Sequence, residues 1–236
     1  MKRFLSVLMI CTFVFTMALP VMAVETEPTD QTEESFDLIE YLEDHTVRTQ
    51  SDFFDVIEYY GNDEAADSIV GCKAEWEKHK SEYSAESFTY QVDVENQLVY
   101  TTTVHSKDTN SSARYVGKQK SVAVSKTVYS SSGIRLFYVE GHATFNYLSG
   151  VSSEAVSGEG YFNPAVLSAW TGSVAVDKGN YSATKAFVKV YGTANLNLGV
   201  AEILGLQLNI QSVNFVLTIT CDSDGNVEDF YSQSTT

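Results

Sequence analysis

The chain has 236 residues, of which 44% are hydrophobic and 19% are charged, and its formal net charge is -16. A balance this acidic argues against nucleic acid and against anionic membranes as partners, because both repel a negatively charged protein. The excess is uneven: residues 24–86 carry 19 acidic and 4 basic side chains, whereas residues 87–236 carry 12 and 9.

The first 23 residues have the pattern of a secretory signal peptide. A basic start precedes an apolar run over residues 4–19, and a small-x-small cleavage pattern ends at Ala23. We therefore expect a secreted, extracellular protein without a transmembrane segment in the mature chain; an uncleaved membrane anchor is the alternative. Residues 24–35 are acidic and almost free of large apolar side chains, which predicts a disordered linker.

Residues 36–86 have the hydrophobic period of α-helices, and we expect two or three helices that pack on the rest of the chain. Ser51 is the predicted N-cap of one helix. Asn62 is the predicted cap of another, which runs to Tyr83. The apolar stripe of that helix consists of Ala65, Ile69, Cys72, Trp76 and Tyr83, with spacings of 4, 3, 4 and 7. Whether this segment is a separable prosegment stays open.

From residue 87 to residue 236 the hydrophobic period falls to two, which is typical of β-strands. About eight strands with short connections favour a mainly β fold, an antiparallel β-sandwich or barrel. A core strand is expected over residues 206–221, with a bulge near Gln211 where the apolar phase slips by one residue. Residues 149–160 are expected to form a loop, and residues 177–180 a tight turn.

Two segments carry a resemblance to a broader class of proteins. They are FYVEGHATFNY at residues 137–147 and the end of the last core strand, TCDSDGN at residues 220–226. Over residues 120–230 the chain resembles uncharacterised exported β-sandwich modules of Gram-positive bacteria. The resemblance implies the sandwich fold and export, and it assigns no function to any residue.

The mature chain keeps two cysteines, Cys72 and Cys221. Two cysteines in an exported protein are consistent with one disulfide. Two buried free thiols are the alternative, because free cysteine is among the most buried residue types.

Glu140 and His142 are the strongest candidates for chemistry. They lie two residues apart in a predicted strand and therefore on one face, where a carboxylate can pair with an imidazole. His105 lies in another strand, and the favoured interpretation is that these are solvated strand residues. The chain has no HExxH, GxSxG, CxxC or phosphate-binding glycine loop, so no catalytic residue, cofactor or transition-metal site is predicted.

A weak calcium site is the one metal alternative. Acidic and amide side chains alternate after the last core strand, in the pattern D-x-D-x-N-x-E: Asp222, Asp224, Asn226 and Glu228. An EF-hand loop needs its glycine after the third ligand, and Gly225 comes too early. A plain hairpin turn is the competing interpretation.

Several aromatic residues fall in loops or on the outward phase of strands. Such residues stack on sugar rings or dock protein partners. The predicted ligand-binding residues are Tyr161, Phe162, Trp170 and Tyr191. A second buried face, covered by the helices, is the alternative.

The function best matched to these features is a non-enzymatic exported binding module that acts at the cell surface, on extracellular glycan or on protein. An exported hydrolase with its site around Glu140 and His142 is the alternative. A β-pore-forming protein is a third interpretation, because alternating Ser/Thr-rich strands suit membrane hairpins.

Overall fold

The computed structural model describes residues 36–110, 117–165, 169–197, 199 and 212–235. Every described residue belongs to one compact unit, Ser35–Thr236. The expected signal peptide, the acidic linker and the bulge near Gln211 lie outside the described residues.

Three helices precede the strands: α1 (Leu38–Asp44), α2 (Gln50–Tyr60) and α3 (Asp63–Glu82). Each helix is preceded by an N-cap residue, Asp37, Thr49 or Asn62, whose side chain accepts a hydrogen bond from a backbone N–H group of the first turn. The Asn62 cap of α3 is confirmed, with its Oδ1 2.8 Å from the Ala65 nitrogen. The cap of α2 is Thr49 rather than Ser51, so this helix starts at Gln50, two positions earlier than predicted.

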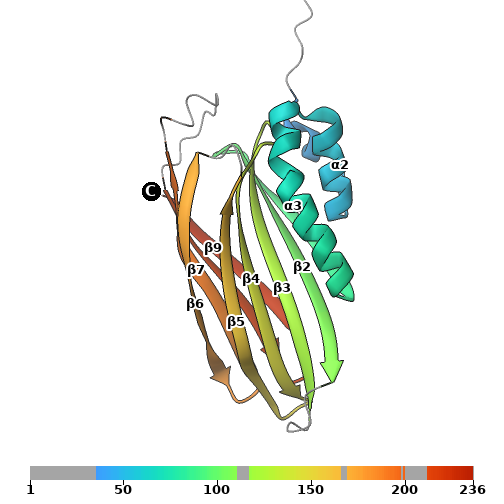
Figure 1. Cartoon of the computed structure of the whole chain (residues 1–236), viewed down its shortest axis with the longest axis vertical. Coiled ribbons are helices and arrows are strands. Elements are labelled where there is room, and N and C mark those ends of the chain that lie inside the picture. The colour runs from blue at the N-terminus through green and yellow to red at the C-terminus, as the bar shows by residue number, and fades with distance from the viewer. Residues whose placement is uncertain (1–35, 111–116, 166–168, 198, 200–211, 236) are drawn as a thin grey trace, which may run out of the picture. The chain divides into compact units, whose positions relative to one another are not determined.

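Nine antiparallel strands follow in the described residues, arranged in two sheets (Figure 1). The first sheet has the order β1-β2-β3-β4-β5 and the second has the order β6-β7-β8-β9. Their bounds are β1 (Ala85–Asp93), β2 (Leu98–Asn110), β3 (Lys118–Ser130), β4 (Arg135–Leu148), β5 (Ser152–Pro164), β6 (Trp170–Ser182), β7 (Lys185–Leu196), β8 (Ser212–Asp222) and β9 (Val227–Thr235). The predicted mainly β, antiparallel fold is confirmed. The described strands form two open sheets rather than a closed barrel.

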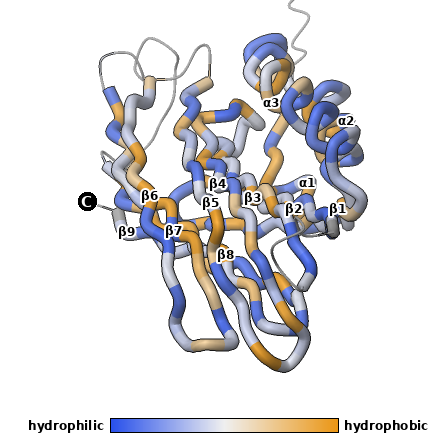
Figure 2. The backbone as a smooth tube through the Cα atoms, turned by 60° about the horizontal axis from the view of Figure 1, so that its bottom comes forward, coloured by the Kyte–Doolittle hydropathy of each residue, from blue (hydrophilic) through white to orange (hydrophobic). Residues whose placement is uncertain are grey.

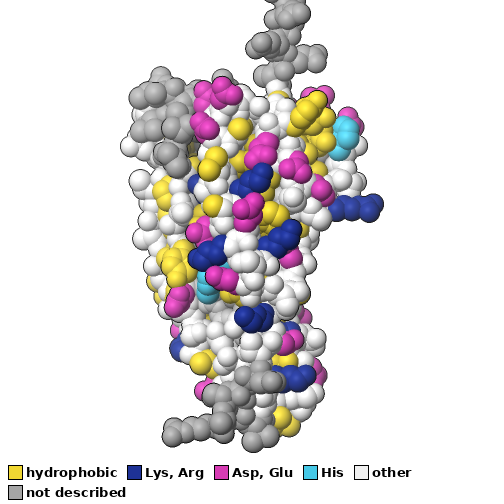
Figure 3. Space-filling view, turned by 45° about the vertical axis from the view of Figure 1, so that its right-hand side comes forward, with side chains coloured by type: hydrophobic (Ala, Val, Ile, Leu, Met, Phe, Trp, Pro, Cys, Tyr) yellow, Lys and Arg dark blue, Asp and Glu magenta, His cyan; other side chains and the backbone are white. Residues whose placement is uncertain are grey.

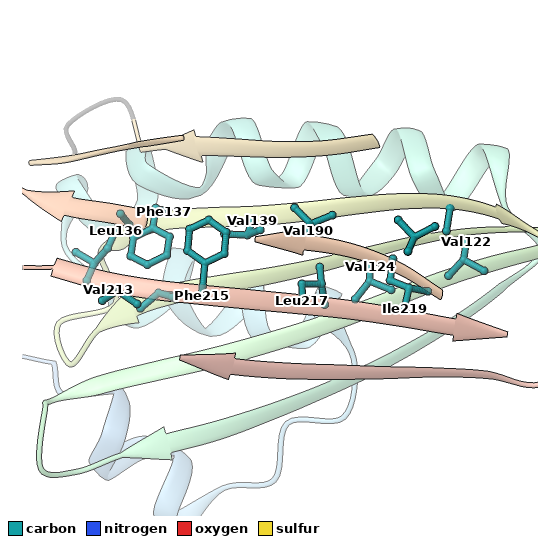
Figure 4. Close-up of a cluster of buried hydrophobic side chains, with 14 of the residues drawn as sticks. Val122, Val124, Leu136, Phe137, Val139, Val190, Val213, Phe215, Leu217 and Ile219 are labelled. Atoms are coloured by element: carbon teal, nitrogen blue, oxygen red, sulfur yellow. The ribbon is translucent and has the colours of Figure 1, made fainter. Parts of the chain in front are cut away.

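The main core lies between the two sheets. Alternate residues of the central strands point into it, as Figure 4 shows for Phe137 and Val139 of β4 and for Phe215 and Leu217 of β8. Residues of the opposite phase, such as Tyr138, belong to a different cluster on the other face of the first sheet. The hydropathy colouring of Figure 2 shows the same mixture of hydrophobic and hydrophilic positions along the strands. The two-residue rhythm therefore makes each face of β4 part of a different layer.

The helices cover the outer face of the first sheet. Phe53 and Ile57 of α2 and Ile69 of α3 are fully buried in the second cluster, together with Val99 of β2 and Tyr129 of β3. The order of layers is helices, five-stranded sheet, four-stranded sheet. None of the described helices combines the length and the apolarity needed to cross a membrane.

Two predicted connections are wrong. Residues 149–160 were expected to form a loop, but β5 begins at Ser152, and its glycines mark close packing instead of a turn. A Cβ atom on Gly160 would lie 2.6 Å from Val190 Cγ1. The turn expected at residues 177–180 is also absent, because β6 continues to Ser182 as a polar, largely exposed edge strand.

Candidate functional site

Helix α3 contributes a histidine to the interface between the helices and the first sheet. The sheet-facing stripe of α3 includes Ile69, Cys72 and Trp76, and His79 continues it three positions later. Residues three and four apart share one helix face, so His79 points at the sheet. Only 2% of its surface is exposed. An imidazole is therefore held under the helix instead of an aliphatic side chain.

Strand β4 contributes two further groups below this histidine. Glu140 and His142 alternate with the core residues of β4 and face the helix layer. Glu140 is 5% exposed, whereas the His142 side chain is 30% exposed. Ser125 of β3 lies opposite Glu140 in the sheet register, and its hydroxyl donates to Glu140 Oε2 at 3.2 Å. The neighbouring strand thus fixes the orientation of the carboxylate.

The three side chains converge on one point. His79 Nε2 lies 3.3 Å from Glu140 Oε1, and His142 Nε2 contacts the same oxygen. One ligand atom from each residue lies within 4.8 Å of the other two. Tetrahedral coordination with metal–ligand bonds of 2.0–2.2 Å places neighbouring ligand atoms about 3.4 Å apart. The group can therefore enclose a metal ion after small side-chain rotations.

More rings surround the cluster. The ring of His105 on β2 lies 5.3 Å from that of His79, between centroids, and His142 lies 5.4 Å from Tyr161. Tyr83 lies edge-on to His79 at 5.8 Å. His105 is 2% exposed, and its Nδ1 has no hydrogen-bond partner, although Glu86 Oε2 lies 3.9 Å away. The cluster thus has a buried side at His105 and a solvent side at Tyr161.

The charges of the cluster depend on each other. Burial alone would raise the pKa of Glu140, but the hydrogen bond and charge of His142, the charge of His79 and the Ser125 hydroxyl together hold that pKa below its usual value. Burial, helped by the charge of His79, lowers the pKa of His105 to about 4. Glu140 is therefore a carboxylate and His105 a neutral imidazole at neutral pH.

A small cavity lies beside the cluster, on its buried side. It has a volume of about 30 Å³, and its lining includes His79, His105 and Glu140 together with Gln50 and Trp76. A volume of this size holds about one or two water molecules. The cavity is large enough for water and too small for an organic substrate.

On the surface, Figure 3 shows acidic and basic side chains interspersed on the face turned forward, with histidine among them.

The four aromatic residues predicted to bind a ligand are divided between the core and the surface. Trp170 is 2% exposed and belongs to the core between the sheets, where its ring lies 5.0 Å from that of Phe137. Phe162 packs partly against the same core. Tyr161 and Tyr191 are 46% and 42% exposed, on β5 and β7 respectively. The outward position expected for Trp170 is therefore wrong, because its strand begins inside the sandwich.

The acidic side chains around the turn between β8 and β9 bond to the turn itself and to its neighbours. The Asp222 carboxylate accepts hydrogen bonds from the backbone nitrogens of Asp224 and Asn226 and from the Asn226 amide. Asp224 accepts from Ser149 and Gly150, and Glu228 pairs with Lys185 at 2.6 Å. These oxygens serve the turn and its neighbours, as the hairpin interpretation requires.

The expected disulfide is also not present. Cys72 and Cys221 are both free and buried. Cys72 belongs to the cluster under the helices, where Arg135 Nη1 lies 3.2 Å from its sulfur, whereas Cys221 belongs to the core between the sheets. The five-stranded sheet separates the two clusters, so the two thiols cannot meet in this fold.

The sequence interpretation missed His79. The signal was present: the stripe of α3 had spacings of 4, 3, 4 and 7, and the gap of 7 between Trp76 and Tyr83 is filled by His79 at 3 and 4. The interpretation of Glu140, His142 and His105 as solvated strand residues is wrong for Glu140 and His105, because both are buried. The pairing of Glu140 with His142 is present.

Comparisons with known proteins add no further assignment. No family model, no curated protein and no solved structure matched the chain.

Proposed function

We propose that the protein is an exported, non-enzymatic binding protein whose ligand at this site is a divalent transition-metal ion. The observation that carries the proposal is the convergence of His79, Glu140 and His142, with three potential ligand atoms within 4.8 Å. This is the one such group of three His, Cys, Asp or Glu residues found in the described part of the chain. Export is the expectation from residues 1–23.

The types of ligand atom point to the class of ion. Two imidazole nitrogens and one carboxylate oxygen suit Zn²⁺ and its neighbours in the first transition row. Calcium and magnesium prefer sets made of oxygen atoms only. Zn²⁺ is the ion that we expect to bind, because three protein ligands of this kind are common around it.

The surrounding residues would support such an ion. Ser125 holds the second oxygen of Glu140 and leaves Oε1 directed at the two imidazoles. Hydrogen bonds of this kind orient metal ligands and raise affinity. Because His79 and Glu140 come from α3 and β4, a bound ion would also join the helix layer to the sheet.

An exported hydrolase at the same residues is the second candidate. Its supporting observation is that three protein ligands leave a coordination position for water, as in catalytic zinc sites. The cavity beside the site, however, has a volume of only about 30 Å³. Binding without turnover is therefore the better match to the geometry.

Metal titration of the purified protein after treatment with a chelator tests the proposal. We expect one equivalent of Zn²⁺ by calorimetry and, with Co²⁺, the visible absorption bands of tetrahedral coordination. His142→Gln should weaken Zn²⁺ binding at least tenfold, and its partial exposure makes misfolding easy to avoid. His45→Gln, at an exposed histidine that ends α1, is the matched control and should bind normally.

Two results would decide against the proposal. If the protein takes up no Zn²⁺, or if His142→Gln and His45→Gln lose affinity equally, the cluster is not a metal site. Zinc-dependent cleavage in ester, peptide and glycoside panels that falls with His142→Gln would favour the hydrolase instead.

A further inference from the structure

The second sheet has an outer face that the described helices leave uncovered. All three helices pack on the first sheet, on the other side of the molecule (Figure 1). Val190 of β7 and Leu217 of β8 point into the core, so the residues of the opposite phase on these strands point away from it. The outward residues of β6, β7, β8 and β9 together form a broad sheet surface, which we call the outer face.

Aromatic side chains gather on the outer face. Phe187 and Tyr191 lie on β7, on either side of Lys189. The strand register places Phe230 of β9 in the same row as Lys189, two strands away. Tyr181 packs beside Phe187, with 4.6 Å between the ring centroids. Tyr181, Tyr191 and Phe230 are 58%, 42% and 64% exposed, and several exposed rings on one face are typical of an interaction surface.

The charged side chains of the outer face balance each other. Lys185 lies 2.6 Å from Glu228. Asp177 stands opposite Lys189 in the strand register. Asp222 ends β8, and its carboxylate is bonded to the backbone of the turn that follows. The outer face therefore presents no block of unmatched charge of either sign to a partner.

The opposite side of the molecule is strongly acidic. Residues 36–83, which include the helix layer, carry 13 acidic and 4 basic side chains, and the formal charge of the whole chain is -16. Two copies that approach through their helix layers repel each other. Two copies that approach through their outer faces keep these acidic layers on the far sides of the pair, where distance and salt weaken the repulsion.

The area of the outer face is close to what a weak dimer needs. Four strands about 4.8 Å apart make the face roughly 19 Å wide, and the nine residues of β9 extend for about 30 Å. These dimensions give a projected area of roughly 600 Å² per copy, or about 1,200 Å² for two copies. Stable protein interfaces bury about 1,200–2,000 Å² in total. The outer face lies at the lower end of this range and therefore fits a reversible contact.

We propose that the outer face is the contact between two copies of this chain, which form a dimer with a two-fold axis. Such a dimer packs two sheets face to face, and the same surface of each copy serves both sides of the contact. Phe230 and Tyr191 are the expected anchors, because exposed aromatic rings near the centre of an interface carry much of its binding free energy. The balanced charge favours a second copy over a strongly acidic or basic partner, which would gain no attraction here.

Sedimentation velocity of the purified protein, over concentrations from micromolar to millimolar, tests the proposal. A chelator is present throughout, so the result does not depend on the metal site. We expect a monomer–dimer equilibrium with a dissociation constant in the micromolar range. Raising the salt concentration should preserve or strengthen the dimer, because salt screens the repulsion between two acidic chains.

Phe230→Glu should weaken the dimer at least tenfold, because the two-fold axis brings two unpaired carboxylates into one interface. Tyr59→Glu is the matched control. It adds the same charge at a ring that is 80% exposed on α2, in the helix layer, and should dimerise like the parent protein. Circular dichroism verifies that each variant is folded. If Phe230→Glu is not folded, Tyr191→Glu on β7 is judged by the same criterion.

Four results would overturn the proposal. The first is a monomer at every concentration. The second is a dimer that forms unchanged in the folded Phe230→Glu protein, which would place the contact on another surface. The third is an equal loss of affinity in Phe230→Glu and Tyr59→Glu, which would reflect net charge alone. The fourth is a dimer that weakens as salt rises, as expected of a contact made by ion pairs.

Discussion

Ser68→Ala should destabilise the protein through a single buried hydrogen bond between α3 and the first sheet. The Ser68 hydroxyl accepts a hydrogen bond from the backbone nitrogen of Arg135 at 2.8 Å and donates to the carbonyl of Ala65 at 2.7 Å. Ser68 is 1% exposed, so water cannot replace the lost group. Alanine therefore leaves the backbone N–H of Arg135 at the start of β4 without this partner.

A buried polar group left without a partner costs about 1–3 kcal/mol. With a urea m-value of about 2 kcal/mol/M, a loss of this size lowers the unfolding midpoint by about 0.5–1.5 M. Urea unfolding followed by circular dichroism measures the shift. The m-value should be the same for the parent protein and Ser68→Ala if both unfold from the same compact state.

Ser81→Ala is the matched control, because Ser81 lies on the same helix and its hydroxyl also donates to a carbonyl three residues earlier, that of Lys78 at 2.7 Å. Ser81 is exposed and lies near the end of α3. We expect its free energy of unfolding to change by less than about 0.5 kcal/mol. Equal effects of the two substitutions would contradict the role given to the buried bond.

Two further predictions concern backbone packing and pH. Gly192→Ala should lower the free energy of unfolding by about 3 kcal/mol or more, because the added Cβ would lie 1.9 Å from the Ser173 carbonyl oxygen. Gly71→Ala, on an exposed helix face with nothing within 4 Å of the added Cβ, should raise it by about 0.5–1 kcal/mol. Thermal or urea unfolding measures both, and similar effects of the two substitutions would refute the packing argument. In the metal-free folded protein His105 has a pKa of about 4, whereas in the unfolded chain it takes up a proton near pH 6.5. Because the unfolded chain binds this proton more tightly, the free energy of unfolding should fall by up to about 3 kcal/mol as the pH drops from 6.5 to 4. The lowered pKa of Glu140 should add to the loss below pH 4.5, and His105→Asn should remove most of the loss above it.

Much of the fold was predictable because period and capping are local. The cap at Asn62 and the two phases of β4 follow from a few neighbouring residues. The strand β5 was missed because Gly158 and Gly160 look like loop residues, and their purpose becomes visible only when Val188 and Val190 of β7 lie against them. Such close packing is a property of the partner strand, which the local pattern does not contain.

The site was predictable only in part. The pairing of Glu140 with His142 follows from strand alternation, but the third group arrives from α3. Which face of β4 the helices cover is a tertiary fact, so His79 and Glu140 could not be joined from spacing alone. The prediction for Trp170 was wrong for a related reason. Its outward position was inferred from the local pattern, which does not show that the strand begins in the core.

The contact between α3 and the sheet differs along its length. Near Ile69 the helix rests on aliphatic and aromatic side chains, whereas near His79 it rests on hydroxyl, imidazole and carboxylate groups that water solvates readily. Detaching the C-terminal turns of α3 from the sheet should therefore cost less free energy than detaching its N-terminal turns. Transient detachment should start at the Glu82 end. An ion held between His79 and Glu140 would fasten the end of the helix that is otherwise first to come loose, and amide exchange along α3 would record the difference.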